Sequence, residues 1–278
     1  MLKRKPPQQE PLQQKSSGTS NAFLKTKEQW LDEGNTYYRA ERYREAIAAF
    51  KRVIQLDPNS AEAYVNKGSA LYNLKRYGEA LEAYEQAIRL DVGLASAYYG
   101  KGCVYYKLDL YVEALAAFEQ AIRIGPNSAI FHNNKGFLLW KFRRYEEALT
   151  AFEQAIALDP KLTAAYMGKG NVTLYNLNRS EEALAAFEQA IALDPDSTDA
   201  HCGKGHALVG LERYAEALAA YERAIRLDHD NISAYQGKQQ VLLYLGRSLE
   251  AQRVSEKALQ LYVGMWILKI FKRQRQQK

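Results

Sequence analysis

The chain has 278 residues, of which 47% are hydrophobic and 25% are charged, and its formal net charge is +6. The sequence contains no Gly-rich phosphate loop and no GxSxG nucleophile motif. Asp199, Cys202 and His206 are spaced to share one side of a helix and could hold a metal ion, but no second histidine pair or CxxC motif supports such a site. The sequence therefore disfavours an enzyme, a cofactor-binding protein and a metalloprotein.

Residues 1–26 are rich in Gln, Pro, Ser and Lys and carry a net charge of +4. A segment of this composition buries too little apolar surface to fold, so we expect a disordered basic N-terminal tail. The tail contains no apolar run, which disfavours a secretory signal. The chain has only two cysteines, which suits a reducing compartment, and we expect a cytoplasmic protein.

Residues 27–265 consist of a unit of 34 residues that repeats in register. Glycine recurs at position 8 of the first six units and alanine near position 20, as at Gly68 and Ala80. Apolar residues three and four apart follow in both halves of each unit, which predicts two closely packed helices per unit. The seven units are 27–60, 61–94, 95–128, 129–162, 163–197, 198–231 and 232–265.

This pattern resembles the tetratricopeptide repeat (TPR). The first unit carries the family's signature residues, except that Glu33 stands where leucine is usual; the matching residues are Trp30, Gly34, Tyr37, Ala46, Phe50 and Pro58. The resemblance implies an all-α, right-handed superhelical solenoid of antiparallel helix pairs that binds other proteins.

The fifth unit, 163–197, contains one additional residue near the end of its first helix. One inserted residue rotates an α-helix by about 100°, so we expect a local bulge or a shifted turn. A simple loop adjustment is the alternative.

The C-terminal segment carries an apolar stripe at helical spacing: Leu259, Tyr262, Val263, Trp266, Ile267 and Ile270. We expect a capping helix that covers the end of the core, with residues 266–278 forming its end and a basic tail. Self-association through 259–271 is one alternative. Residues 264–278 carry a net charge of +5, so an interfacial membrane helix is another. The apolar run is too short to span a membrane.

The resemblance also implies that the first helices line a concave groove, with positions 2, 5, 6, 9, 12 and 13 facing the ligand. An aromatic residue stands at position 12 in four consecutive units, and Tyr175 continues the series if the alignment is shifted by the inserted residue. Aromatic rings dominate the energetics of many interfaces. The predicted binding residues are Asn35, Tyr38, Arg39, Asn66, Tyr72, Asn73, Tyr99, Tyr106, Lys107, Phe137, Trp140, Lys141 and Tyr175. Alternatively, the position-12 rings only pack against the next unit.

Asn35 and Asn66 match the family's carboxylate clamp for C-terminal acidic peptides. The clamp's cations are replaced by Leu31, Ser96 and Gly100, so chaperone-type recognition is disfavoured.

Position 7 is lysine in six units, beginning with Lys67 and Lys101. We expect the stems of these lysines to pack and their ammonium groups to reach a carboxylate such as the Asp at position 31; a cationic ladder for a polyanion is the alternative. The two tails account for +9, so the body between them carries −3, which argues against nucleic acid as the main ligand.

The sequence thus predicts a non-catalytic scaffold that binds a peptide segment of another protein, extended or helical, and no small-molecule substrate. An assembly or membrane-associated role of the C-terminal helix and nucleic-acid binding through the basic tails are the alternatives.

Overall fold

The computed structural model describes the backbone of residues 25–276 and the side chains of residues 25–264. Most of the predicted N-terminal tail and the side chains of Trp266, Ile267 and Ile270 lie outside these described residues. Within them the chain forms fourteen α-helices and no strand. The helices are α1 (Lys27–Arg39), α2 (Tyr43–Leu56), α3 (Ala61–Asn73), α4 (Tyr77–Leu90), α5 (Ala95–Lys107), α6 (Tyr111–Ile124), α7 (Ala129–Lys141), α8 (Tyr145–Leu158), α9 (Thr163–Tyr175), α10 (Ser180–Leu193), α11 (Thr198–Gly210), α12 (Tyr214–Leu227), α13 (Ile232–Tyr244) and α14 (Ser248–Gln276).

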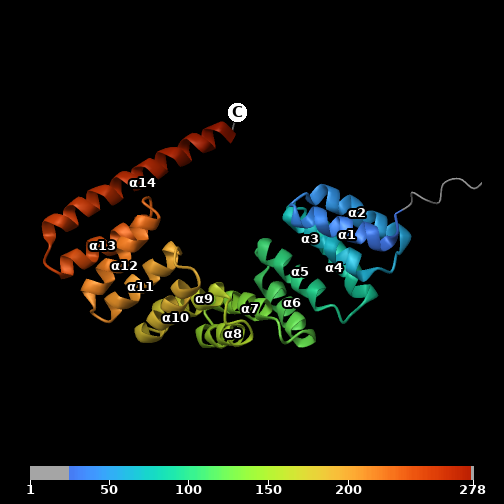
Figure 1. Cartoon of the computed structure of the whole chain (residues 1–278), viewed down its shortest axis with the longest axis horizontal. Coiled ribbons are helices and arrows are strands. Elements are labelled where there is room, and N and C mark those ends of the chain that lie inside the picture. Colours follow the sequence, from blue (N-terminus) through green and yellow to red (C-terminus); the bar gives the residue numbers. More distant parts are fainter. Residues whose placement is uncertain (1–24, 277–278) are drawn as a thin grey trace, which may run out of the picture.

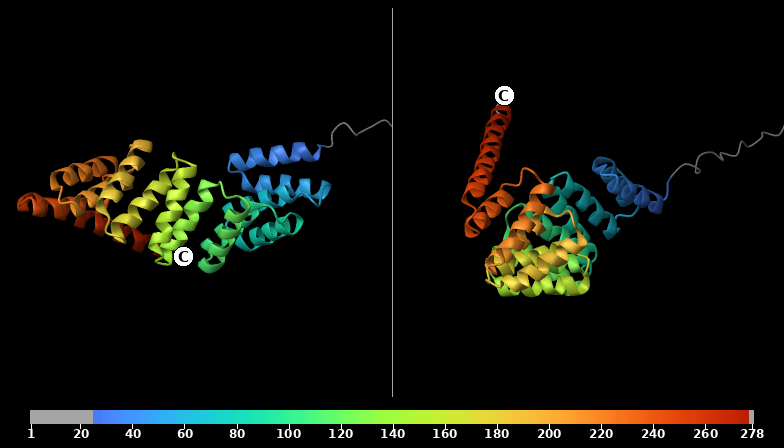
Figure 2. Two further views of the ribbon diagram at one scale, coloured as in Figure 1. Left: turned by 90° about the horizontal axis from the view of Figure 1, so that it is seen from below. Right: turned by 60° about the vertical axis from the view of Figure 1, so that its left-hand side comes forward.

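The helices pack as consecutive pairs, and each pair stacks on the next to form an all-α solenoid (Figure 1). The pairs follow an arc, with α5, α7 and α9 towards its inner side and α6, α8 and α10 towards its outer side (Figure 1). The two further views show the same succession of layers (Figure 2). Each pair therefore buries its apolar side against its neighbours, as stacked repeats require.

The loops within a helix pair and the loops between pairs are stabilised in different ways. A residue in the left-handed region, such as Lys75 with φ of 59°, reverses the chain between the two helices of a pair. At five of the six connections between pairs, an aspartate side chain accepts a hydrogen bond from the backbone N–H two residues later, as from Asn59 to Asp57 Oδ1 at 3.1 Å; Gly125 takes the place of the aspartate between α6 and α7. Ser60 then caps the next helix by accepting a hydrogen bond from the backbone of Ala63.

The expected close approach at position 8 is present, because an aromatic ring of the second helix lies against each glycine. A Cβ on Gly136 would lie 2.9 Å from Phe152 Cε1. Gly168, at position 6 of the next repeat, also lies against this ring. A Cβ on Gly168 would lie only 2.4 Å from Phe152 Cε1. Glycine also stands at this position in α5, α11 and α13, so the ring is held between two helices at four of the interfaces between repeats. The position-6 glycines are a feature that the sequence analysis did not identify.

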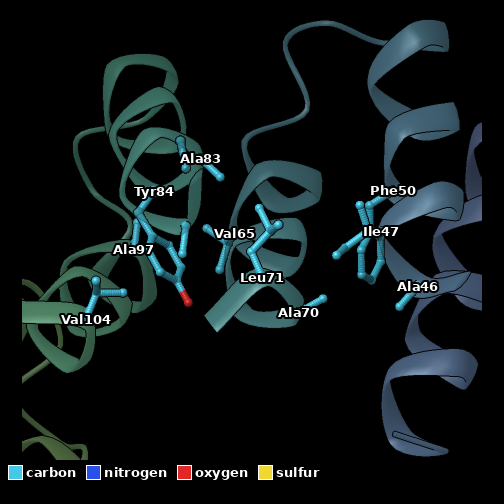
Figure 3. Packing of buried hydrophobic residues seen from close by; sticks show 12 residues of the cluster. Ala46, Ile47, Phe50, Val65, Ala70, Leu71, Ala83, Tyr84, Ala97 and Val104 are labelled. Atoms are coloured by element: carbon cyan, nitrogen blue, oxygen red, sulfur yellow. The ribbon is translucent and has the colours of Figure 1, made fainter. Parts of the chain in front are cut away.

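Apolar residues from neighbouring pairs meet around these rings. Figure 3 shows Phe50 and Ile47 of α2, Leu71 of α3, Tyr84 of α4 and Val104 of α5 in one buried cluster. Their exposed fractions are at most 5%. Interdigitation of this kind ties each pair to the next and keeps the inner surface in a fixed arrangement.

The lysines at position 7 pair with glutamates and not with the aspartates that we expected. Lys169 Nζ lies 2.7 Å from Glu153 Oε1, on the second helix of the preceding repeat. The same pairing occurs at Lys101–Glu85, Lys135–Glu119, Lys204–Glu188 and Lys238–Glu222. The position-31 aspartates cap the turns instead. The first interface differs, because Lys67 faces Lys51, and burial together with this second lysine lowers the pKa of Lys67.

The inserted residue of the fifth repeat lies in the turn and not in the helix. Helix α9 has 13 residues, like the other first helices, and ends at Tyr175. Four residues, 176–179, then connect it to α10, whereas three residues connect α3 to α4. Arg179 N–H bonds back to Thr173 O across this longer turn, so the turn is shifted without a bulge in the helix.

The last helix combines two elements that the sequence analysis kept separate. Helix α14 is the second helix of the seventh pair and continues without a break to Gln276, past the end of α13 (Figures 1 and 2). Ala251 and Ala258 are buried, with α13 as the neighbouring helix. Leu259, Tyr262 and Val263 are 62%, 60% and 45% exposed, so this part of the apolar stripe does not cover the core.

Candidate functional site

A pocket of about 360 Å³ opens on the inner surface between the third and fourth repeats. Its walls come from α3, α5, α6 and α7, and most of its lining is aromatic. The lining residues are Tyr72, Cys103, Tyr106, Lys107, Phe118, Asn134 and Phe137. Four of these residues, Tyr72, Tyr106, Lys107 and Phe137, belong to the predicted groove.

Sequence reasoning missed Cys103, Phe118 and Asn134. Phe118 is the position-24 ring of the third repeat, which the resemblance treats as core. Asn134 stands at position 6, where four other repeats have glycine, so the break in that glycine column was the signal that could have identified it.

The pocket has poorly hydrated walls. Burial raises the pKa of the Tyr72 hydroxyl to about 12 and the pKa of the Cys103 thiol to about 11. Burial likewise raises the pKa of Tyr99 well above its usual range. A thiol with a raised pKa is a poor nucleophile at neutral pH, so Cys103 is part of the lining and not a reactive group.

Tyr99 is hydrogen-bonded to Asn134, a residue of the pocket lining. Its ring stacks on Phe131 with centroids 4.8 Å apart, and its hydroxyl accepts a hydrogen bond of 2.8 Å from Asn134 Nδ2. Asn134 Oδ1 in turn accepts from Asn133 Nδ2 at 3.2 Å. These bonds hold the Asn134 side chain in one orientation.

The position-12 rings of the first three repeats pack within their own repeat. Tyr38, Tyr72 and Tyr106 each lie 5.5–5.8 Å, between ring centroids, from the tyrosine that begins the following helix. This arrangement differs from packing against the next repeat's first helix. Each ring nevertheless remains partly exposed on the inner surface.

Polar contacts join neighbouring repeats along the same surface. Asn73 Nδ2 donates to the Tyr38 hydroxyl at 3.0 Å, and Trp140 Nε1 donates to Asn176 Oδ1 at 2.7 Å. Trp140 is 36% exposed. These contacts hold the Tyr38 and Trp140 rings in fixed orientations.

Asn35 and Asn66, two of the remaining predicted residues, are hydrogen-bonded to each other. Asn66 Nδ2 donates to Asn35 Oδ1 at 3.1 Å, so the residues that match the carboxylate clamp form an internal bond. Lys141 Nζ lies 2.9 Å from the Tyr111 hydroxyl and 4.2 Å from the centroid of its ring. Arg39 is exposed in the last turn of α1.

Tyr175 does not continue the position-12 series. Because α9 has no extra residue, Leu174 occupies position 12 and packs against the core, whereas Tyr175 stands at position 13. Tyr175 is 54% exposed, and its hydroxyl lies 3.0 Å from His206 Nδ1. The shifted alignment was wrong at this residue, although Tyr175 remains close to α11.

The side chains that we considered as metal ligands are used in other contacts: His206 contacts Tyr175, and Cys202 Sγ lies 3.9 Å from Asn231 Oδ1. Among the described residues, no group of three or more His, Cys, Asp or Glu side chains is placed to hold a metal ion. Within the same part of the chain, no helix combines the length and apolarity needed to cross a bilayer.

Comparison with known proteins identifies the repeat. Models of the tetratricopeptide repeat match residues 31–95, 133–198, 172–232 and 202–263, and a second model of this repeat matches 95–128. No curated protein sequence matches the chain.

Several solved structures are similar. One is YrrB, described as a TPR protein with an unusual peptide-binding site; it is 30% identical, with a TM-score of 0.60, and the match covers 69% of this chain and 98% of YrrB. MamA residues 41 to the end from Desulfovibrio magneticus is 23% identical (TM-score 0.58), with 61% of this chain and 96% of MamA covered. The pilF protein of Pseudomonas aeruginosa is 19% identical (TM-score 0.64), with 77% and 97% covered. The last two likenesses concern the fold alone. The family models and YrrB establish that this chain belongs to the tetratricopeptide-repeat family.

Proposed function

We propose that the chain is a non-catalytic adaptor whose inner surface binds a segment of another protein. The TPR fold is a protein–protein interaction scaffold. The observation that carries the proposal for the inner surface is the pocket of about 360 Å³ lined by Tyr72, Tyr106 and Phe137. Similarity to YrrB, which has a peptide-binding site, supports the same assignment.

The size and lining of the pocket favour a side chain of a protein segment over a cofactor. Small-molecule pockets range from about 300 to 1,000 Å³, so this one is at the lower end. Its aromatic walls can bury an apolar group, while Trp140, which is 36% exposed on α7, offers further contact area along the arc. A segment laid along α5, α7 and α9 would use several such points at once.

The test compares capture of cellular partners by the full chain and by the double variant Tyr106→Ala/Trp140→Ala. A matched control, Tyr64→Ala/Tyr98→Ala, removes two rings at position 4 of α3 and α5, which are not part of the pocket lining. All proteins are compared at temperatures equally far below their melting temperatures. We expect the double variant to lose a partner that the control retains. Equal capture by all three would place binding elsewhere.

A second candidate function is assembly through α14. The observation that favours it is the exposure of Leu259 and Tyr262 beside a hollow of about 310 Å³ between α13 and α14. A mass that rises with concentration in light scattering, and returns to the monomer value in the variant Leu259→Gln/Tyr262→Gln, would support it. A constant monomer mass for the full chain would exclude it.

A further inference from the structure

The inner surface changes character at one interface between repeats, where α5 and α7 meet. At four interfaces, a glycine at position 6 of the first helix lies against the ring of the preceding repeat, as Gly100 lies against Tyr84. Two first helices have asparagine there instead: Asn66 in α3 and Asn134 in α7. Consecutive first helices approach one another less closely at these two interfaces than at the four glycine interfaces. An amide side chain fills space that a hydrogen atom leaves free, so it keeps the helices apart.

The two asparagines have different consequences. Asn66 meets Asn35, and the pair bridges the gap between α1 and α3 with a bond of 3.1 Å. Asn134 points its amide at Tyr99, on α5, and remains part of the pocket wall. The gap between α5 and α7 is therefore open, and Phe118 forms its floor.

The pocket lining carries positive and no negative charge. Lys107 is exposed and is the charged residue of the pocket lining. Outside the lining, Lys141 and Asp109 both contact Tyr111, so their charges offset each other. No lining residue is acidic. The residues before 27 and after 263 carry +4 and +5, so the charge of the chain's own tails does not match this pocket. An acidic segment of a different protein has the charge that complements Lys107.

We propose that the pocket between α5 and α7 receives one bulky apolar side chain of a partner protein, with an Asp or Glu of the same segment pairing with Lys107, and that Asn134 sets this specificity by keeping the pocket open. This inference rests on the proposed function, since it names the class of segment that the inner surface binds. The apolar side chain would displace water from aromatic walls, and the carboxylate would stay at the exposed rim.

Another hollow, between α8, α9 and α10, fits such a segment less well. It measures about 420 Å³ and has an apolar lining. Its lysine and one of its glutamates, Lys169 and Glu153, already form an ion pair of 2.7 Å. A ligand carboxylate would have to compete with Glu153, whereas Lys107 forms no ion pair within the described residues.

The experiment uses a phage-displayed random 12-residue peptide library selected on the full chain, followed by affinity measurements with the selected synthetic peptides. Asn134→Gly tests the opening, because four other repeats have glycine at this position and fold with it. Thr150→Gly, on the exposed side of α8, replaces a residue whose helix propensity is similar to that of asparagine and serves as the control. Lys107→Glu tests the charge preference.

A second readout reports on the pocket directly. Cys103 lines it, so its rate of alkylation by excess iodoacetamide at about pH 9, where part of the thiol is ionised despite its raised pKa, measures access when followed by mass spectrometry of the peptide that contains it. We expect Asn134→Gly to slow this alkylation, and a bound peptide to slow it in the wild-type chain. Cys202 is buried in α11 and serves as the internal reference.

We expect the selected peptides to share a bulky apolar residue close to an Asp or Glu. Asn134→Gly should weaken their binding about 10-fold or more, and Lys107→Glu should remove the acidic preference. Peptides that lose affinity in Tyr106→Ala/Trp140→Ala but are indifferent to Asn134→Gly would overturn this inference and leave the proposed function standing. Selected peptides with basic residues at the same place would also overturn it. Peptides that bind independently of Tyr106 and Trp140 would overturn both.

Discussion

The ring of Phe152 lies so close to Gly168 that a Cβ on the glycine would be 2.4 Å from Cε1 of the ring. Since Phe152 is fully buried and also touches Gly136, it cannot move away. We expect Gly168→Ala to destabilise the chain by about 1–3 kcal/mol through overpacking, despite the better helix propensity of alanine. Urea unfolding followed by circular dichroism measures the change.

The control for this prediction is Gly78→Ala. Gly78 lies in the first turn of α4, and a Cβ there would meet nothing within 4 Å. The same substitution should therefore be neutral or stabilise by up to about 1 kcal/mol. If both variants were equally stable, the close contact between Phe152 and Gly168 would not limit the packing.

The interface between the first and second repeats contains a repulsion between two lysines that one substitution can remove. Lys67 faces Lys51, whereas the equivalent lysines of five later repeats face glutamate. We expect Lys51→Glu to complete the series and to stabilise the chain by about 0.2–1 kcal/mol at low salt, because it replaces a repulsion with a partly exposed ion pair.

The effect of Lys51→Glu should largely disappear in about 1 M NaCl, where charges are screened within about 3 Å. Lys161→Glu, in the exposed turn before α9, makes the same change of net charge and is the control. A gain that is equal in both variants would be due to net charge and not to the pairing with Lys67.

His206 should make stability depend on pH. Burial lowers its pKa from the ordinary value of 6.5, so the folded state prefers the neutral ring. In the unfolded chain the ring takes up a proton near pH 6.5, and the stability due to this residue is therefore complete above that pH and lost as the pH falls towards the folded pKa. We expect His206→Gln to lose less stability than the wild-type chain between pH 7.5 and pH 5, as measured by urea unfolding. Parallel loss in both proteins would contradict this role.

The two faces of α14 should respond differently to the same change. Ala258 is 7% exposed and packs towards α13, whereas the neighbouring Leu259 is 62% exposed. We expect Ala258→Gln to cost about 1–3 kcal/mol through overpacking and polar burial. Leu259→Gln should change the unfolding free energy of the monomer by less than about 0.5 kcal/mol. The opposite order, in dilute monomeric samples, would mean that α14 is rotated relative to α13.

Much of the fold follows from the period of the sequence, because the glycine and alanine columns place the same helix crossing in every repeat. The position-6 glycines could not be recognised as a column, since Asp32, Asn66 and Asn134 interrupt it. One of the interrupting residues, Asn134, lines the pocket. Phe118 is buried in the core and also lines the pocket, and repeat spacing alone does not reveal this second role.

The errors have local causes. The inserted residue moved into a turn, where an extra residue costs less than rotating α9, so Tyr175 kept its helical position. The lysine partners depend on which surface of the preceding second helix faces the next repeat, and repeat spacing alone does not reveal this. The aspartates were already used, because their side chains hold the turns, as Asp159 does for Lys161 N–H at 2.9 Å.

The central claim is that a partner segment lies on the inner surface of the solenoid, beside α5 and α7. Replacing Trp140 by the photo-reactive amino acid p-benzoylphenylalanine keeps an aromatic ring at an exposed point on this surface; the same residue at Thr150, exposed on α8, is the matched control. On illumination of the full chain with its captured partner, we expect cross-links from position 140 and none from position 150. Cross-links from position 150 without any from position 140 would contradict the account.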